Sequence, residues 1–192
     1  MSFCENIKEE IQKADCRNKN CSLAFISGFA AFTLSVEDNK AAFLTDGEEI
    51  GKKMSYLMKK QFSIGDGSLS RAYVGRGGKC YKLSYGGEET KKILSALSDK
   101  NEGGEDGFFV DSERFNTTDE MRHFVMGAFL GGGFAADPYK IYHLEFVAKR
   151  ERALDELGYI FSEFGEIQKR VLRNGYYVMY FKSYDSLENI LN

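Results

Sequence analysis

A run of closely spaced glycines constrains this chain more than any other feature of its sequence. The stretch from Gly127 to Pro138 reads GAFLGGGFAADP and closes a helical pattern that begins at Thr117. Glycine inside a helix costs about 1 kcal/mol relative to alanine, so several glycines near one helix end need a structural reason. The usual reason is close approach, because a helix face without side chains can lie directly against another backbone.

A second run of small residues lies earlier in the chain. The segment from Leu23 to Val36 reads LAFISGFAAFTLSV, and four of its small residues are spaced to form one stripe along a helix. Two small-faced helices in one chain predict that they pack against each other at its centre. The residues expected at this helix interface are Ala24, Ser27, Gly28, Ala31, Gly127, Gly131 and Gly133.

The composition is that of an ordinary globular protein, folded as one domain or as two small halves. The 192 residues are 43% apolar and 29% charged, with a net charge of -3. This acidic balance argues weakly against a domain built only to grip phosphates. The start MSFCENIKEE lacks the pattern of a secretory signal, and no apolar run reaches the length of a membrane span. We therefore expect a cytoplasmic protein, with association with the nucleoid as an open alternative.

The four cysteines do not have the spacing of a metal site. Cys16 and Cys21 are five residues apart, outside any paired C-x-x-C set, and both histidines lie far downstream of them. We expect free, reduced thiols at Cys4, Cys16, Cys21 and Cys80, and neither a metal nor another cofactor.

The hydrophobic periodicity predicts an N-terminal helix over 2–14 and then the same series of elements twice. Each copy reads helix, hairpin, helix, hairpin, helix, at an offset of about a hundred residues. In the first copy these are the small-faced helix, a hairpin over 33–46, a helix over 47–62, a hairpin over 68–85 and a helix over 88–98. In the second they are a helix over 117–131, an extended run over 142–149, a helix over 150–164, a hairpin turning at 174–175 and a helix from 186.

The duplication divides the chain into four expected parts. Residues 1–20 form an N-terminal helical extension, residues 21–98 the first half and residues 117–192 the second half. Residues 99–116 lie between the halves and begin with DKNEGGEDG, which is acidic and has no apolar periodicity. We expect this segment to be a linker.

The duplicated plan and its two small-residue motifs resemble the LAGLIDADG homing-endonuclease fold. VMGAFLGGG, residues 125–133, aligns with the nine-residue motif and places Gly127 and Gly133 on its two glycines. ISGFAAFTL, residues 26–34, aligns with the other copy, where Leu34 replaces the second glycine. The resemblance implies an α+β fold, a tandem pseudo-twofold αββαββα arrangement with two small antiparallel sheets and central small-residue helices.

The whole chain is also similar to the N-terminal two-thirds of WhiA-type transcription regulators of bacterial sporulation and cell division. The similarity rests on MSFCENIKEEI, CSLAFISGF and, most specifically, GAFLGGGFAADPYKIYHLEF. Members of that family continue into a C-terminal helix-turn-helix domain, and no such segment follows Asn192 in this sequence. The resemblance implies a module that supports or regulates DNA binding carried mainly by that domain, or that binds a protein partner.

The resemblance also implies where an active nuclease would hold its metal. In active members the eighth motif position is an acid in each copy, and the two acids bind divalent metal at the scissile phosphates. Here those degenerate positions are Thr33 and Gly132, and neither is anionic. We therefore expect a protein that is not an enzyme. Two alternatives stay open: a metal-dependent nuclease with relocated acids such as Asp137, and a scaffold that only binds proteins.

Three further features have a structural interpretation that we favour. Asp137-Pro138 is expected to form a turn before the next strand. His143 is expected to share the less apolar sheet face with Glu145 and Lys149. The glycine run follows a helix and lacks the lysine of a phosphate-binding loop, and the glycine-rich segment 75–78 is expected to be a hairpin turn.

Duplex DNA lies on a saddle formed by both halves in the active nucleases, so basic residues in or beside the hairpins are candidate DNA contacts. The net negative charge and the acidic linker argue against strong duplex affinity, which comes largely from phosphate neutralisation. Exposed basic residues on strands also serve solubility. The candidates are Arg71, Arg76, Lys79, Lys82, Lys149, Arg170 and Arg173. Target promoters, oligomeric state and effectors do not follow from the sequence.

Overall fold

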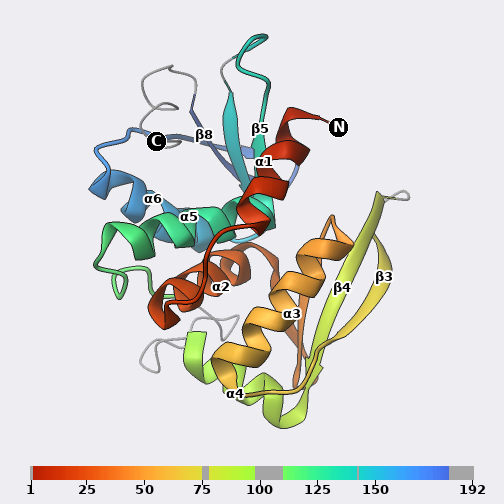
Figure 1. Cartoon of the computed structure of the whole chain (residues 1–192). Coiled ribbons are helices and arrows are strands. Elements are labelled where there is room, and N and C mark those ends of the chain that lie inside the picture. Colours follow the sequence, from red (N-terminus) through yellow and green to blue (C-terminus); the bar gives the residue numbers. More distant parts are fainter. Residues whose placement is uncertain (1, 75–77, 98–109, 142, 182–192) are drawn as a thin grey trace.

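The structure, a computed structural model, describes residues 2–74, 78–97, 110–141 and 143–181. Two helices, one from each half of the chain, lie side by side at the centre of the molecule, and each half also contains a four-stranded antiparallel sheet (Figure 1). The expected α+β fold, with two small antiparallel sheets and central small-residue helices, is confirmed. Within the described ranges no helix combines the length and the apolar character that crossing a membrane requires.

The first half contains both hairpins that its alternating pattern predicts. Its strands form the first sheet, in the order β1-β2-β4-β3. Asp38 and Asn39 have positive φ at the tip of the first hairpin, a backbone conformation that short hairpin turns require. Arg76 and the rest of the second turn, 75–77, lie outside the described residues. The elements are α2 (Lys19–Thr33), β1 (Leu34–Glu37), β2 (Lys40–Thr45), α3 (Glu48–Phe62), β3 (Ser68–Val74), β4 (Gly78–Gly86) and α4 (Gly87–Leu97).

The second half repeats this order and forms the second sheet, β5-β6-β8-β7. Asn174 and Gly175 both have positive φ, so the predicted hairpin turn is confirmed. The hydrophobic pattern does not resolve β5, which has three residues and pairs with β6. The helix expected from residue 186 lies outside the described residues. The elements are α5 (Thr118–Gly132), β5 (Gly133–Ala135), β6 (Leu144–Ala148), α6 (Glu151–Glu163), β7 (Lys169–Arg173) and β8 (Tyr176–Phe181).

The N-terminal helix α1 (Phe3–Gln12) begins with the predicted capping box. The Ser2 hydroxyl accepts from the Glu5 backbone N–H at 3.2 Å, and the Glu5 carboxylate accepts from the Ser2 N–H at 2.5 Å. The chain after α1 is held to α3, because the Lys53 ammonium donates to the Ala14 carbonyl at 3.1 Å. The apolar side of α1 packs on the core.

The segment before α5 is packed against the second half. Val110 and Phe115 fall in the range expected to be a linker, yet both are buried, and the Phe115 ring lies 5.8 Å from that of Phe124. Ser112 is also buried, and its hydroxyl donates to the Glu156 carboxylate of α6 at 2.6 Å. These contacts fix the start of the second half. Residues 98–109 lie outside the described residues.

The central contact joins the backbones of α2 and α5. A Cβ built on Gly28 would lie 2.0 Å from the carbonyl oxygen of Phe124. A Cβ built on Gly127 would lie 2.0 Å from the carbonyl oxygen of Phe25, so the contact is reciprocal. Both distances are far below van der Waals contact, and the obstacle is backbone rather than a movable side chain. Only glycine therefore fits at either position.

This contact makes a stability prediction for Gly28→Ala. We expect its free energy of unfolding to fall by at least about 2 kcal/mol, because the methyl group must push α5 away. Gly86→Ala is the matched control, since a Cβ at Gly86 meets nothing within 4 Å. Urea denaturation followed by circular dichroism measures both. A Gly28→Ala protein within about 0.5 kcal/mol of the parent would refute the contact.

Candidate site at the ends of the central helices

The two motif helices end side by side. α2 ends at Thr33 and α5 ends at Gly132, and β1 and β5 begin at the next residue. A Cβ on Gly131 would lie 3.0 Å from the Thr33 methyl carbon, so the two ends touch. The two positions that the resemblance assigns to metal-binding acids therefore lie together at equivalent ends of the central helix pair.

Neither position presents a free ligand. The Thr33 hydroxyl is buried and donates to the Phe29 carbonyl at 2.8 Å within its own helix. At Gly132 a Cβ would lie 2.5 Å from the Val147 carbonyl oxygen and 2.6 Å from the Phe32 ring. A carboxylate side chain at 132 would thus need the backbone of β6 to move.

The other expected interface residues lie along the same helix pair, with one exception. Ala24 and Ser27 are fully buried, and Ala31 is 8% exposed. Gly131 faces α2, as its contact with Thr33 shows. Gly133 instead lies against its own helix, because a Cβ there would meet the Phe129 ring at 2.3 Å.

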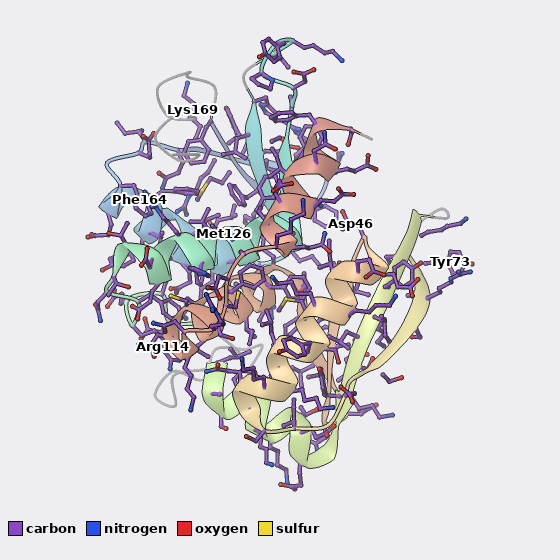
Figure 2. All side chains as sticks on the ribbon, viewed as in Figure 1. Asp46, Tyr73, Arg114, Met126, Phe164 and Lys169 are labelled. Carbon is purple, nitrogen blue, oxygen red and sulfur yellow. The ribbon has the colours of Figure 1, made fainter. Side chains whose placement is uncertain are left out.

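A hollow of about 510 Å³ opens beside these helix ends. α1 forms one wall, and its Lys8 ammonium bonds the Asp46 carboxylate at 2.5 Å (Asp46 is labelled beside α1 in Figure 2). The other carboxylate in the lining is Glu5, whose pKa is held below its ordinary value chiefly by the Ser2 backbone N–H. Both carboxylates are engaged within the protein. Among the residues that the structure describes, no group of three or more His, Cys, Asp or Glu side chains could hold a metal ion.

Asp137 forms the predicted turn. Its carboxylate accepts from the Tyr139 N–H at 3.1 Å, and its carbonyl accepts from the Lys140 N–H at 2.9 Å. The Lys140 ammonium lies 3.8 Å from the same side chain. The carboxylate thus has local structural partners on the turn.

His143 shares one face of the second sheet with Glu145, as expected. The His143 Nε2 lies 2.9 Å from the Glu145 carboxylate, and the Arg173 guanidinium lies 4.0 Å from the same oxygen. The His143 ring is 6.5 Å from the Phe134 ring and 6.4 Å from the Tyr180 ring, centroid to centroid. We call this face, which turns away from α6, the open face of the second sheet.

The candidate DNA contacts do not gather on one surface. Arg170 points to α6, where it donates to the Leu154 carbonyl at 2.9 Å and pairs with Asp155. In the first sheet, Lys82 alternates with the buried Leu83 and so lies on the face that turns away from α3, which we call the open face of the first sheet. By the same alternation Arg71 and Lys79 lie on the other face of the first sheet, on the side of α3. In the second half, Arg173 lies on the open face of the second sheet, and Lys149 is exposed just after β6. Arg76 lies outside the described residues.

Comparisons with known proteins agree with this fold. The family model of the WhiA LAGLIDADG-like domain matches residues 121–192. The probable cell division protein WhiA of Clostridium acetobutylicum is 30% identical over 204 residues, covering 100% of this chain and 64% of the relative. That of Lachnoclostridium phytofermentans is 30% identical over 201 residues, with the same coverage of both chains. The chain is WhiA-like.

Solved structures show the same fold. The N-terminal LAGLIDADG domain of DUF199/WhiA superposes with a TM-score of 0.76 at 18% identity, covering 99% of the WhiA-like chain and 88% of that domain. I-DmoI, solved in complex with DNA and Mn, superposes with a TM-score of 0.56 at 14% identity, covering 91% and 96%. The WhiA-like chain spans 64% of the length of the two curated relatives.

Two features of the site are not among the predictions made from the sequence, and only the second has a signal there. The bond between Lys8 and Asp46 joins residues far apart in the chain, and no local pattern signals it. The rings on the open face of the second sheet do have a signal. The alternation in YYVMYF places Tyr176, Val178 and Tyr180 on one face of β8.

The crowding at the end of α5 predicts the behaviour of Gly132→Asp. We expect its free energy of unfolding to fall by about 1–3 kcal/mol, because the side chain must displace the Val147 carbonyl and the Phe32 ring. Gly86→Asp adds the same charge where a Cβ meets nothing within 4 Å and serves as control. Thermal and urea denaturation measure both variants. Equal stability of the two would show that position 132 has room for an acid.

Proposed function

We propose that this WhiA-like chain is a non-catalytic module of a transcription regulator that acts in bacterial cell division and sporulation. Its role is to support or regulate DNA binding that a helix-turn-helix domain of the whole protein carries. The names of the relatives, probable cell division proteins, support the process. The proposed location is the cytoplasm, with association with the nucleoid as an open alternative.

The crowding at Gly132 is the observation that carries the non-catalytic part of the proposal. Metal-assisted cleavage needs anionic oxygens that can close on a divalent ion at the scissile phosphate. The space that one acid would need is filled by the Val147 carbonyl, and the Thr33 hydroxyl is committed to the Phe29 carbonyl. A nuclease in this fold would require its acids to move elsewhere, and Asp137 is engaged in a turn.

The distribution of basic residues supports a secondary role in duplex binding. Duplex affinity grows with the number of phosphates that cations neutralise. Arg170 is bonded to α6, and Arg71 and Lys79, although exposed, lie on the opposite face of their sheet from Lys82, so few of the candidates can act together on one duplex. The module would therefore add to the affinity of another DNA-binding domain or contact a protein partner.

The first test is nicking of supercoiled plasmid with Mg²⁺ and with Mn²⁺. We expect no metal-dependent nicking above that of heat-inactivated protein. Asp137→Asn should behave like the parent. Metal-dependent nicking that disappears in Asp137→Asn would overturn the proposal in favour of a nuclease with relocated acids.

The second test is fluorescence anisotropy of a labelled duplex over a series of salt concentrations. We expect a dissociation constant in the non-specific range, about 1–100 µM at physiological salt. Lys82→Glu and Arg173→Glu should weaken it further, whereas Arg170→Glu should act mainly on stability, because Arg170 is bonded to α6. Sub-micromolar binding with a steep salt slope would contradict the supporting role. An affinity that salt does not change would favour a protein-binding scaffold.

A further inference from the structure

The open face of the second sheet carries a row of rings that the proposed function leaves unused. Phe134 on β5, His143 just before β6 and Tyr180 on β8 follow one another across the sheet at 6.5 and 6.4 Å between ring centroids. We call these three residues the ring row. Phe134 is 46% exposed, and Tyr176, two residues before Val178 on the same face, is 39% exposed. Phe134 and Tyr176 thus present aromatic surface to solvent on this face, whereas His143 and Tyr180 are half-buried.

In the part of the first sheet that the structure describes, the face turned away from α3 has no such row. Alternation from the buried Phe43 and Leu83 places small or aliphatic residues there, with Lys40 and Lys82 as cations. Among the described residues its exposed tyrosine, Tyr73, belongs to the face on which Arg71 also lies. A duplex saddle uses both halves of a pseudo-twofold fold alike. The asymmetry between the sheets therefore indicates a ligand that needs only the second one.

The charges around the ring row select the part of a ligand that can lie on it. Glu145 lies between Phe134 and Tyr180 in the strand register. Its carboxylate repels a phosphate at that point but can accept from the N–H groups of a base edge. Lys169, opposite Tyr180, and Arg173, whose side chain is 60% exposed, lie toward the outer strand β7 and can neutralise a backbone there.

We propose that the open face of the second sheet binds single-stranded nucleic acid by stacking unpaired bases on the ring row. Exposed rings on a four-stranded antiparallel sheet, with cations beside them, form a platform that suits splayed bases of any sequence. The bases of an intact duplex stack on each other and cannot reach the rings. Val171, 40% exposed, adds apolar surface beside the row.

This inference goes beyond the proposed function and does not depend on it. Phe134 also lines the hollow beside the helix ends, but stacking on the ring row needs neither a metal-binding acid there nor a helix-turn-helix domain. A failure to bind single strands would leave the nicking and duplex results unchanged.

The test is fluorescence anisotropy of the whole chain with labelled eight-nucleotide oligo(dT) and oligo(rU), against a labelled duplex of mixed sequence. We expect at least one single strand to bind about tenfold more tightly than the duplex at equal salt. Binding of oligo(dT) alone, of oligo(rU) alone or of both would support the proposal and distinguish DNA from RNA as the source. No binding of either strand at low salt, or preference for the duplex, would overturn it.

Matched variants separate stacking from charge. Phe134→Leu keeps an apolar side chain but removes the ring, and should weaken single-strand binding about tenfold, whereas Phe134→Tyr should restore it. Tyr73→Leu is the control, because Tyr73 is 70% exposed and lies on the first sheet, far across the molecule from Lys169 of the second (Figure 2). It should change the affinity less than twofold. Equal binding by Phe134→Leu and the parent would overturn the stacking, and equal losses in Phe134→Leu and Tyr73→Leu would do the same.

Discussion

The backbone contact between α2 and α5 is the interaction on which the rest of this structure depends. Gly28 and Gly127 each face a carbonyl of the partner helix, so the two helices lie as close as peptide groups allow. Each helix then runs directly into the first strand of its sheet, at Leu34 or Gly133. Because the strands start where the helices end, the distance between the two helices also sets the position of both sheets.

The same close packing changes what the ends of the helices can do. The Gly132 Cα faces the Val147 carbonyl of β6 and the Phe32 ring of α2. Tight packing there is compatible with the fold and incompatible with a pair of carboxylates that must reach a metal ion. The close helix interface of a LAGLIDADG-like fold thus leaves little space for an acid at position 132.

Local patterns predict most of the fold and part of the site. Spacing of small residues predicts the helix pair, and Asn174-Gly175 predicts its hairpin, because both signals lie within a few residues. Contacts between distant residues carry no such signal. The bond from Lys8 to Asp46 depends on where α1 docks, and Arg170 is a plausible DNA contact until its bonds to α6 are seen. The ring row is predictable in part. Alternation predicts which face of the sheet Tyr180 is on, but not that Tyr180 aligns with Phe134 across the sheet.

Hydrogen exchange measured residue by residue under native conditions tests the central role of the helix pair most directly. If the α2–α5 contact holds the two halves in place, amides in the middle of both helices exchange only through global unfolding. They should then be the slowest in the chain, with the same opening free energy in both helices. Faster exchange in α2 and α5 than in the strands of either sheet would contradict the account, because the sheets would then persist without the helix pair.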